Sequence, residues 1–239
     1  MKSLLLFIMI AGSSAVFASS KVHLDQAPID LTDKDSIASG AQLYVQYCNG
    51  CHSLKHMRYI RIAEDYGIDE AWMDDNVVPS NMKIHDTMLT AMDTEDARVW
   101  FGMPPPDLSL IARAKGADWL YSYLHGFYLD EKKPFGVNNL VSPDVAMPDV
   151  LAPLSGLREL RKNTQETDVV SQRFRIARAG QLSASQFDKA VTDLVAFLTY
   201  ASEPSKHKRE RIGMSVILYL IFFTILAYFL KKEYWKDVH

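Results

Sequence analysis

The sequence predicts an all-α domain followed by one C-terminal transmembrane helix. Three observations support this fold class. Apolar side chains recur at helical spacing in three stretches, a short apolar run opens the chain, and a longer run without charged residues lies near its C-terminal end. With 239 residues, of which 48% are hydrophobic, the chain can form one domain with its own core and an appendage on each side.

The N-terminal apolar run covers residues 1–18. Lys2 gives it a positive start, Leu4–Ile10 form its apolar centre, and small residues end it at Ala18. These features are typical of a secretory signal peptide, and the apolar part is too short for a transmembrane helix. We therefore expect export and cleavage after Ala18, so that the mature protein begins at Ser19. An uncleaved anchor is the alternative.

The first predicted helix covers residues 35–52, because apolar residues within Ser36–Tyr47 are spaced to bury one face. It ends in Cys48-Asn49-Gly50-Cys51-His52, which is the attachment signature of c-type haem. The thiols of Cys48 and Cys51 would add to the two vinyl groups, and their spacing places both sulfurs on one side of a helical turn. His52 would then face the iron as an axial ligand. We expect one covalently bound haem c.

Three other uses of a Cys-x-x-Cys pair are less favoured. A zinc site needs two more ligands, but the chain has no further cysteine, and His56, His85 and His125 show no paired spacing. A redox dithiol would normally begin a helix, whereas this motif follows one. An ordinary disulfide of an exported protein is overridden by the spacing and by His52.

The stretch of residues 64–96 is strongly acidic. Its ten acids stand against Lys83 alone, which leaves nine net negative charges: Glu64, Asp65, Asp69, Glu70, Asp74, Asp75, Asp86, Asp93, Glu95 and Asp96. The stretch is either a solvated polar face or a patch that steers a basic partner. The chain has no basic stripe with interleaved aromatic residues, so nucleic acid is not an expected partner.

Two further helices are expected over residues 117–127 and 187–201, where apolar residues again follow helical spacing. In a haem c domain the first and last helices pack against each other, so we expect the first predicted helix to contact 187–201. Residues 131–147 and 153–172 carry no such pattern and are expected to form long loops.

Two methionines are candidates for the second axial ligand. Met103 and Met147 both lie in irregular stretches bounded by prolines. A thioether ligand would give a six-coordinate iron that only transfers electrons, whereas an open position suits ligand binding or catalysis. Met147 is favoured because the turn-rich segment Asn138–Pro148 can fold over a haem. Spacing alone leaves Met103, another ligand or an open position as alternatives.

The C-terminal apolar run, residues 212–230, contains no charged residue. A helix of this length is about 28 Å long and can cross a bilayer core. Tyr234 and Trp235 follow it and suit the membrane interface. We therefore expect an exported domain over residues 19–205 and a membrane anchor over 206–239 that contacts lipid.

Basic residues flank this run on both sides: Lys206, Lys208, Arg209 and Arg211 before it, and Lys231, Lys232 and Lys236 after it. Basic residues are more frequent on the cytoplasmic side of a membrane span, so these charges alone slightly favour a cytoplasmic location for the residues before the run. The predicted signal peptide favours the opposite orientation, because it exports the domain and the run then stops transfer. We expect the domain outside and a short C-terminal tail inside.

The segment Gly40–Tyr59, GAQLYVQYCNGCHSLKHMRY, resembles the haem-attachment segment of cytochrome c1, the haem subunit of quinol–cytochrome c reductase (complex III). Three further stretches are similar to that family in the same order: Pro105–Lys115, Val145–Pro148, and the region from Glu203 to Val238. The resemblance covers nearly all of the mature chain and is greatest to proteobacterial forms.

The resemblance implies roles for several residues. Met147 would be the second axial ligand, opposite His52. The family uses a basic residue to meet a haem propionate, and Arg113 and Lys115 are the candidates here. Pro106 would belong to the haem surroundings.

The resemblance also implies a function and partners. The chain would take electrons from the Rieske iron–sulfur subunit and pass them to a soluble cytochrome c, while the quinol is oxidised on other subunits such as cytochrome b. It would lie at the bacterial inner membrane, with the haem domain in the periplasm and the C-terminus in the cytoplasm. The alternatives are a stand-alone membrane-anchored cytochrome shuttle, or a haem enzyme or sensor with an open sixth position.

Overall fold

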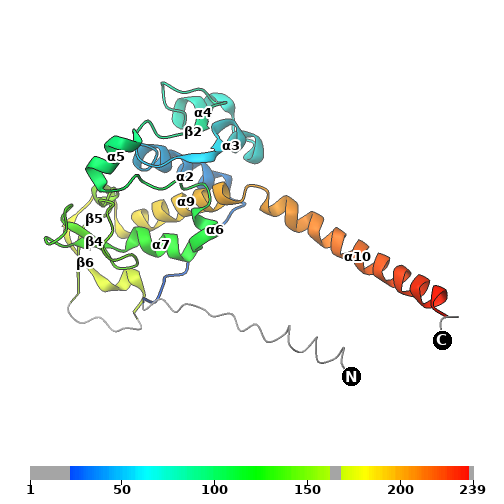
Figure 1. Ribbon diagram of the computed structural model, residues 1–239. Coiled ribbons are helices and arrows are strands. Elements are labelled where there is room, and N and C mark those ends of the chain that lie inside the picture. Colours follow the sequence, from blue (N-terminus) through cyan, green and yellow to red (C-terminus); the bar gives the residue numbers. More distant parts are fainter. Residues whose placement is uncertain (1–21, 162–167, 237–239) are drawn as a thin grey trace.

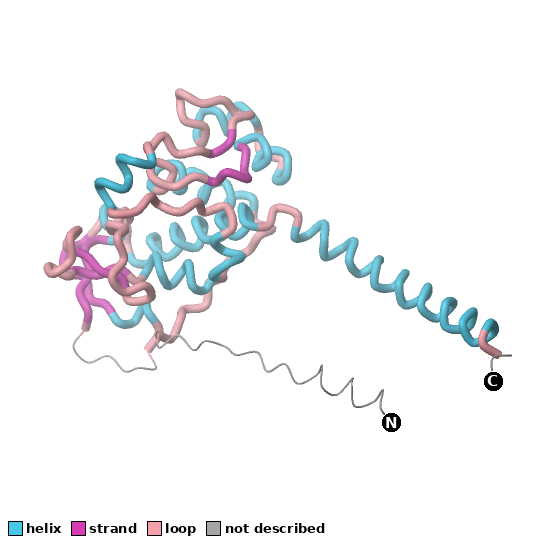
Figure 2. Tube along the Cα trace, in the orientation of Figure 1, coloured by secondary structure: helices cyan, strands magenta, loops and turns pink. Residues whose placement is uncertain are grey.

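The computed structural model describes residues 22–161 and 168–236. The predicted signal peptide and the last residues of the tail lie outside these ranges. Figures 1 and 2 show a body of short helices from which one long helix extends. In chain order the elements are α2 (Lys34–Tyr47), β1 (Leu54–Arg58), α3 (Tyr59–Tyr66), α4 (Glu70–Asn76), β2 (Thr87–Met88), α5 (Thr94–Phe101), α6 (Ile111–Lys115), α7 (Ala117–His125), β3 (Phe127–Leu129), β4 (Val137–Asn139), α8 (Ala152–Ser155), β5 (Gly156–Leu160), η1 (Val170–Arg173), β6 (Phe174–Ala179), α9 (Ala184–Ser202) and α10 (Lys206–Tyr234).

The centre of the body is the contact between α2 and α9, as expected for the first and last helices. Gly40 allows a close approach: a Cβ atom there would lie 2.1 Å from the Asp193 carbonyl oxygen and 2.7 Å from the Phe197 Cβ. The Ser36 hydroxyl donates to the Asp193 carboxylate at 2.7 Å. Nearby, the rings of Tyr44 and Phe197 pack with centroids 5.6 Å apart.

The three predicted helices are present with shifted ends. The first ends at Tyr47 rather than His52, because the backbone N–H groups of Cys51 and His52 donate to the Cys48 carbonyl in a turn. The second ends at His125, and Phe127 pairs with Asn139 in a small sheet instead. The last begins earlier than predicted, at Ala184.

The early start of α9 comes from a capping box. The Ser183 hydroxyl accepts from the Gln186 N–H, and the Gln186 side chain accepts from the Ser183 N–H. This arrangement satisfies two of the N–H groups that a helix start leaves without partners.

Among the described residues the architecture is mostly helical, as predicted, and the strands form only three two-stranded antiparallel sheets: β1–β2, β3–β4 and β5–β6. The prediction of a loop over residues 153–172 is wrong in part, because α8, β5 and η1 lie there. The predicted loop over 131–147 is interrupted by β4 but is otherwise irregular.

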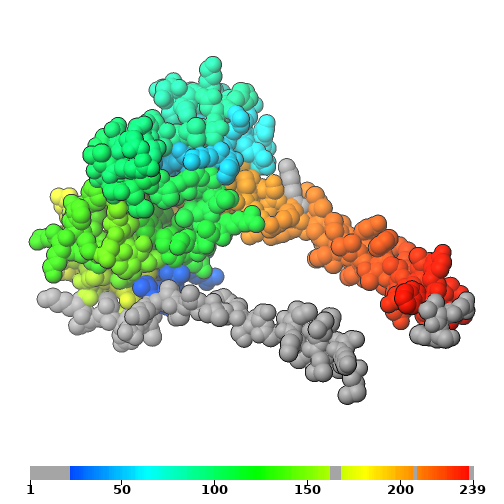
Figure 3. Space-filling model, in the orientation of Figure 1, coloured from blue at the N-terminus to red at the C-terminus, as the bar shows by residue number. Residues whose placement is uncertain are grey.

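The acidic stretch folds into α3, α4, β2 and the start of α5, which lie along the upper side of the body in Figure 3. Several of its acids have structural partners. Asp69 and Asp93 cap the first turns of α4 and α5, and Asp65 bonds to Arg61 and to the Tyr200 hydroxyl. Other acids of the stretch, such as those of α4, are exposed to solvent.

Helix α10 extends away from the body (Figure 1). Its large apolar side chains from Ile212 onward are exposed. Over Arg209–Tyr234 it is long and apolar enough to span a membrane. Only Glu203, Pro204 and Ser205 separate it from α9. The last helix of the body is therefore joined to the candidate membrane span by a three-residue linker.

Replacing Gly40 by alanine tests the close helix contact. Alanine has the better helix propensity by about 0.5–1 kcal/mol, but its methyl group would overlap the backbone of α9, and overpacking costs about 1–3 kcal/mol. We expect Gly40→Ala to lower the free energy of unfolding of the detergent-solubilised holoprotein in urea titrations.

Gly213→Ala is the matched control, because that helical glycine has nothing within 4 Å of an added Cβ. It should leave the stability equal or slightly higher. A Gly40→Ala protein as stable as the Gly213→Ala protein would contradict the close contact.

Candidate haem site

One cavity in the described part of the chain is lined by the Cys-x-x-Cys-His motif, by two later loops, and by side chains of α7 and α9. Its empty volume is ≈ 1180 Å³, which includes the open space at its mouth. Most of the lining side chains are apolar. The sequence-predicted residues that line it are Cys48, Cys51, His52, Pro106 and Met147.

The cysteine motif occupies a hydrogen-bonded turn directly after α2. Cys48 is the C-cap of the helix, and its carbonyl accepts from the N–H groups of Cys51 and His52 at 3.0 and 2.8 Å. The Tyr44 hydroxyl donates to the His52 carbonyl at 2.6 Å, and the Thr90 hydroxyl donates to the Gly50 carbonyl at 2.8 Å. The turn is therefore held at both ends, and both thiols reach the same cavity.

The thiols have properties opposite to those of a redox dithiol. Burial, and then the nearby charge of Cys51, raises the pKa of Cys48 to about 12. Burial also raises the pKa of Cys51. Reactive dithiols need a lowered thiol pKa, so these shifts argue against that alternative.

His52 is oriented by the backbone of the Pro105–Ser109 loop. Its Nδ1 lies 2.7 Å from the Pro106 carbonyl oxygen, which can only accept, so Nδ1 carries the proton. Nε2 is then free to bind a metal, and a hydrogen-bonded Nδ1 is the usual arrangement in metal-binding histidines. Burial lowers the pKa of His52 and favours the neutral imidazole that coordination needs.

The loop that carries Pro106 is itself fixed beside the motif. The Asp107 carboxylate accepts from the backbone N–H groups of Lys55 and Ser109, each at 3.0 Å. The Leu108 N–H donates to the Ser53 carbonyl at 2.9 Å. Burial acts to raise the pKa of Asp107, but its hydrogen bonds from Ser109 and Lys55 lower it overall. The ionised carboxylate thus ties the loop to the chain after the motif.

Met147 reaches the cavity from the loop that precedes α8. Its sulfur lies 3.3 Å from the Tyr123 hydroxyl, which donates a hydrogen bond to it. Tyr123 belongs to α7, and its ring stacks on that of Trp119 with centroids 4.9 Å apart. All three side chains line the cavity.

The remaining candidates lie farther out. Met103 also lines the cavity, but 60% of it is exposed. Arg113 and Lys115 are exposed on α6 and do not line the cavity. The Lys115 ammonium lies 5.3 Å from the centre of the Trp119 ring, which does line it.

These residues fit a c-type haem. The cavity presents two thiols, an imidazole whose Nδ1 is already engaged, and a thioether, within walls that are mostly apolar. This is the donor set of a six-coordinate haem with histidine and methionine ligands.

Two contacts of the site could not be predicted from the sequence. Pro106 was expected in the haem surroundings from the resemblance, but the hydrogen bond from His52 to its carbonyl involves a backbone group and has no residue-type signal. The role of Tyr123 has no local signal, because its hydroxyl meets a sulfur from a different part of the chain.

Comparisons with known proteins agree with this site. A model of the Cytochrome C1 family matches residues 25–153 and 180–238. Cytochrome c1 of Allochromatium vinosum is 44% identical over 98% of this chain and 97% of its own length. A Nitrosomonas europaea protein named as an ammonia monooxygenase gamma subunit is 41% identical over 100% of this chain and 98% of its own. The mitochondrial cytochrome c1 haem protein of Saccharomyces cerevisiae is 27% identical over 96% of this chain and 76% of its own. The resemblance noted in the sequence is thereby confirmed, and the chain belongs to the cytochrome c1 family.

Proposed function

We propose that this chain is the haem-bearing electron-transfer subunit of a quinol–cytochrome c reductase, taking electrons from the Rieske iron–sulfur subunit and passing them to a soluble cytochrome c. The observation that carries the proposal is that Cys48, Cys51, His52 and Met147 line one apolar cavity in a member of the cytochrome c1 family. The quinol is oxidised on partner subunits, among them cytochrome b.

Four residues are proposed to bind one covalent haem c. Cys48 and Cys51 would form the thioether links to the haem, and His52 and Met147 would hold its iron. When bound, the haem stores and releases one electron at its iron. The protein keeps the ligand set fixed through the Pro106 carbonyl at His52 and the Tyr123 hydroxyl at Met147, and so limits rearrangement between oxidation states.

Arg113 and Lys115 are the proposed partners of the haem propionates. Both are exposed on α6, next to the cavity wall formed by Ile111 and Trp119. Lys115 has the better support, because its ammonium already lies over the Trp119 ring.

The proposed organisation follows the predicted segments. Residues 1–18 form the signal peptide, 19–205 the periplasmic haem domain, and 206–239 the anchor in the inner membrane with a cytoplasmic C-terminus. The anchor contacts lipid and cytochrome b. The short junction between α9 and α10 favours a fixed subunit over a stand-alone shuttle on a flexible linker.

Met147→Leu tests the axial ligand. Leucine is similar in volume but cannot bind iron, so the reduced variant should bind carbon monoxide and its midpoint potential should fall. Optical spectra of the detergent-extracted complex measure both. Met103→Leu is the matched control, since Met103 lines the same cavity, and it should remain inert to carbon monoxide.

A wild-type protein that already binds carbon monoxide would overturn the six-coordinate site. If Met103→Leu bound carbon monoxide and Met147→Leu did not, Met103 rather than Met147 would be the iron ligand.

Tyr123→Phe tests the hydrogen bond to the Met147 sulfur. Without the donor the sulfur gives more electron density to the iron, which favours the oxidised state. A neutral hydrogen bond contributes about 1 kcal/mol, and a tenfold change in a one-electron equilibrium is about 59 mV. We therefore expect the midpoint potential to fall by tens of millivolts in a redox titration. An unchanged or raised potential would argue against this contact.

Amide substitutions in α4 test the proposed electrostatic steering. Glu70, Asp74 and Asp75 are exposed acids. The triple variant Glu70→Gln, Asp74→Asn and Asp75→Asn should slow reduction of a basic soluble cytochrome c on the order of threefold to tenfold at low ionic strength. The difference should vanish at high salt, because screening removes the attraction. Stopped-flow rates over a salt series measure it, and equal slopes for variant and wild type would remove the steering role.

A further inference from the structure

The β5–β6 hairpin lies in the interval 154–179, between the two segments that match the family model. Its strands pair antiparallel, with Leu160 opposite Phe174 and Gly156 opposite Ala179. Its base is closed by two glycines: a Cβ atom on Gly156 would lie 2.6 Å from the Gly180 nitrogen, and one on Gly180 would lie 2.3 Å from the Gly156 nitrogen. The two ends of the hairpin therefore lie in direct backbone contact, which leaves no room for a side chain at either glycine.

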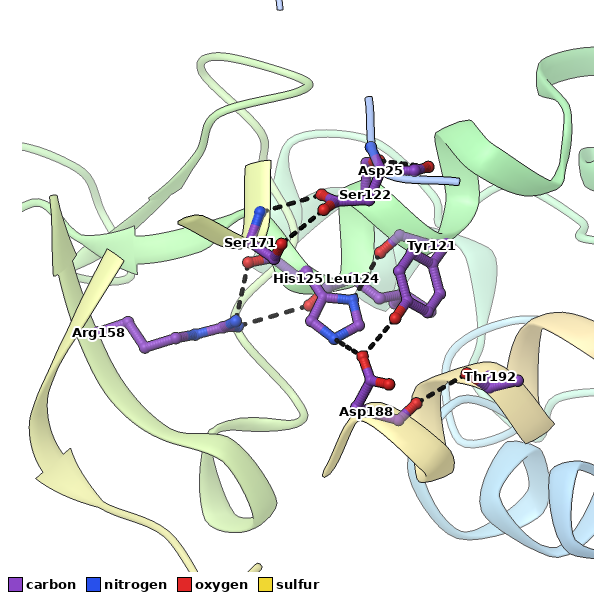
Figure 4. Close-up of polar contacts among 9 residues, drawn as sticks. All are labelled: Asp25, Tyr121, Ser122, Leu124, His125, Arg158, Ser171, Asp188 and Thr192. Carbon is purple, nitrogen blue, oxygen red and sulfur yellow. Dashed lines mark hydrogen bonds and ion pairs between the residues drawn. The ribbon is translucent and has the colours of Figure 1, made fainter. Parts of the chain in front are cut away.

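Arg158 is the inward-facing centre of this hairpin. Only 8% of it is exposed, and its guanidinium carbon lies 5.5 Å from the centre of the Phe174 ring and 5.4 Å from that of Phe187. One terminal nitrogen donates to the His125 carbonyl at 2.8 Å, and the other approaches the Leu124 carbonyl at 3.5 Å (Figure 4). These carbonyls belong to the last turn of α7, where a cation also meets the negative end of the helix dipole.

A second contact holds the same helix end from α9. The Tyr121 hydroxyl donates to the Asp188 carboxylate, and the His125 Nε2 lies 3.6 Å from an oxygen of that carboxylate. The His125 Nδ1 donates to the Tyr121 carbonyl at 3.0 Å. Figure 4 shows His125 between Arg158 of the hairpin and Asp188 of α9. The C-terminal end of α7 is therefore in contact with Arg158 of the hairpin on one side and with Asp188 of α9 on the other.

Another face of α7 forms a wall of the haem cavity. Leu120, Tyr123 and Leu124 line it, and Tyr123 donates to the Met147 sulfur. The carbonyl that Arg158 approaches is that of Leu124, the residue after Tyr123. One buried guanidinium thus contacts the C-terminal end of the helix whose Tyr123 hydroxyl meets the Met147 sulfur.

We propose that Arg158 is a positioning residue for the Met147 side of the haem: by bonding the last carbonyls of α7, it fixes the place from which the Tyr123 hydroxyl meets the Met147 sulfur. This inference rests on the proposed ligation by Met147. If Arg158 has this role, the β5–β6 hairpin helps to set the reduction potential of the haem.

The choice of arginine supports this role. Filling the gap between Phe174 and Phe187 would need only an apolar side chain, and such a replacement of a buried charge often costs little. The planar guanidinium instead reaches two successive carbonyls at once, which a lysine cannot do in the same way.

The test compares three full-length haem-loaded variants in the detergent-extracted complex. Arg158→Met keeps the length and apolar stem but removes the donors, and Arg178→Met makes the same charge change on an exposed arginine of β6. The third, Arg158→Lys, keeps the cation and serves where Arg158→Met does not fold. The readouts are the midpoint potential, the methionine–iron charge-transfer band of the oxidised protein, and carbon monoxide binding by the reduced protein.

We expect Arg158→Met to shift the redox equilibrium at least threefold toward the oxidised form, which is about 28 mV at 59 mV per tenfold change. Its charge-transfer band should weaken, while Arg178→Met matches the wild type. Arg158→Lys should shift in the same direction by less. Arg158→Met should also be non-additive with Tyr123→Phe, since both act on the same hydrogen bond.

The outcomes distinguish failure of the proposed Met147 ligation from failure of the proposed role of Arg158. A wild type that binds carbon monoxide refutes ligation by Met147, and with it the proposed function. A wild type that is inert, with a folded Arg158→Met or Arg158→Lys protein of unchanged potential and band, refutes the positioning role alone. Strict additivity with Tyr123→Phe, or an equal shift in Arg178→Met, refutes the route through α7.

Discussion

The close contact of α2 with α9 at Gly40 sets the position of everything else in the domain. Helix α2 ends at Cys48, so its placement fixes where the cysteine motif lies. Helix α9 contributes Leu194 and Leu198 to the cavity that the motif faces. Because Gly40 brings the two backbones together, the cavity wall and the attachment point are parts of one rigid unit. A side chain at Gly40 would separate them, even though it would favour α2 locally.

The second half of the site depends on α7, which is held at its end by Arg158 and Asp188 and faces the cavity along another side. The two axial positions are therefore supported differently. His52 is oriented by a backbone carbonyl one loop away, whereas the Met147 sulfur is met by a helix side chain. A backbone acceptor depends on the local path of the chain, but Tyr123 depends on how α7 is packed. Distant substitutions should disturb the Met147 side more readily than the His52 side.

The parts that could be predicted from the sequence are those with local signals. Helical periodicity predicted α2, α7 and α9, and the cysteine motif predicted the attachment turn. The hairpin was missed because its inward position holds the charged Arg158 while Leu160 is exposed, which reverses the alternation that indicates a strand. Spacing could not choose between Met103 and Met147, because the choice depends on which side chain the fold brings inside. The hydrogen bond of Tyr123 is likewise a tertiary contact.

The link to the anchor follows from the same rigid unit. Helix α9 lines the cavity near its C-terminal half and is followed after only Glu203–Ser205 by α10. Glu203 also forms an ion pair with Arg209, one turn into α10. The distance between the cavity and a membrane spanned by α10 is therefore limited by the short Glu203–Ser205 linker rather than by the reach of a long flexible tether. A domain attached by so short a linker has less freedom to move toward its electron donor and acceptor than a domain on a long flexible tether. The exposed acids of α4 would favour a partner that carries positive charge.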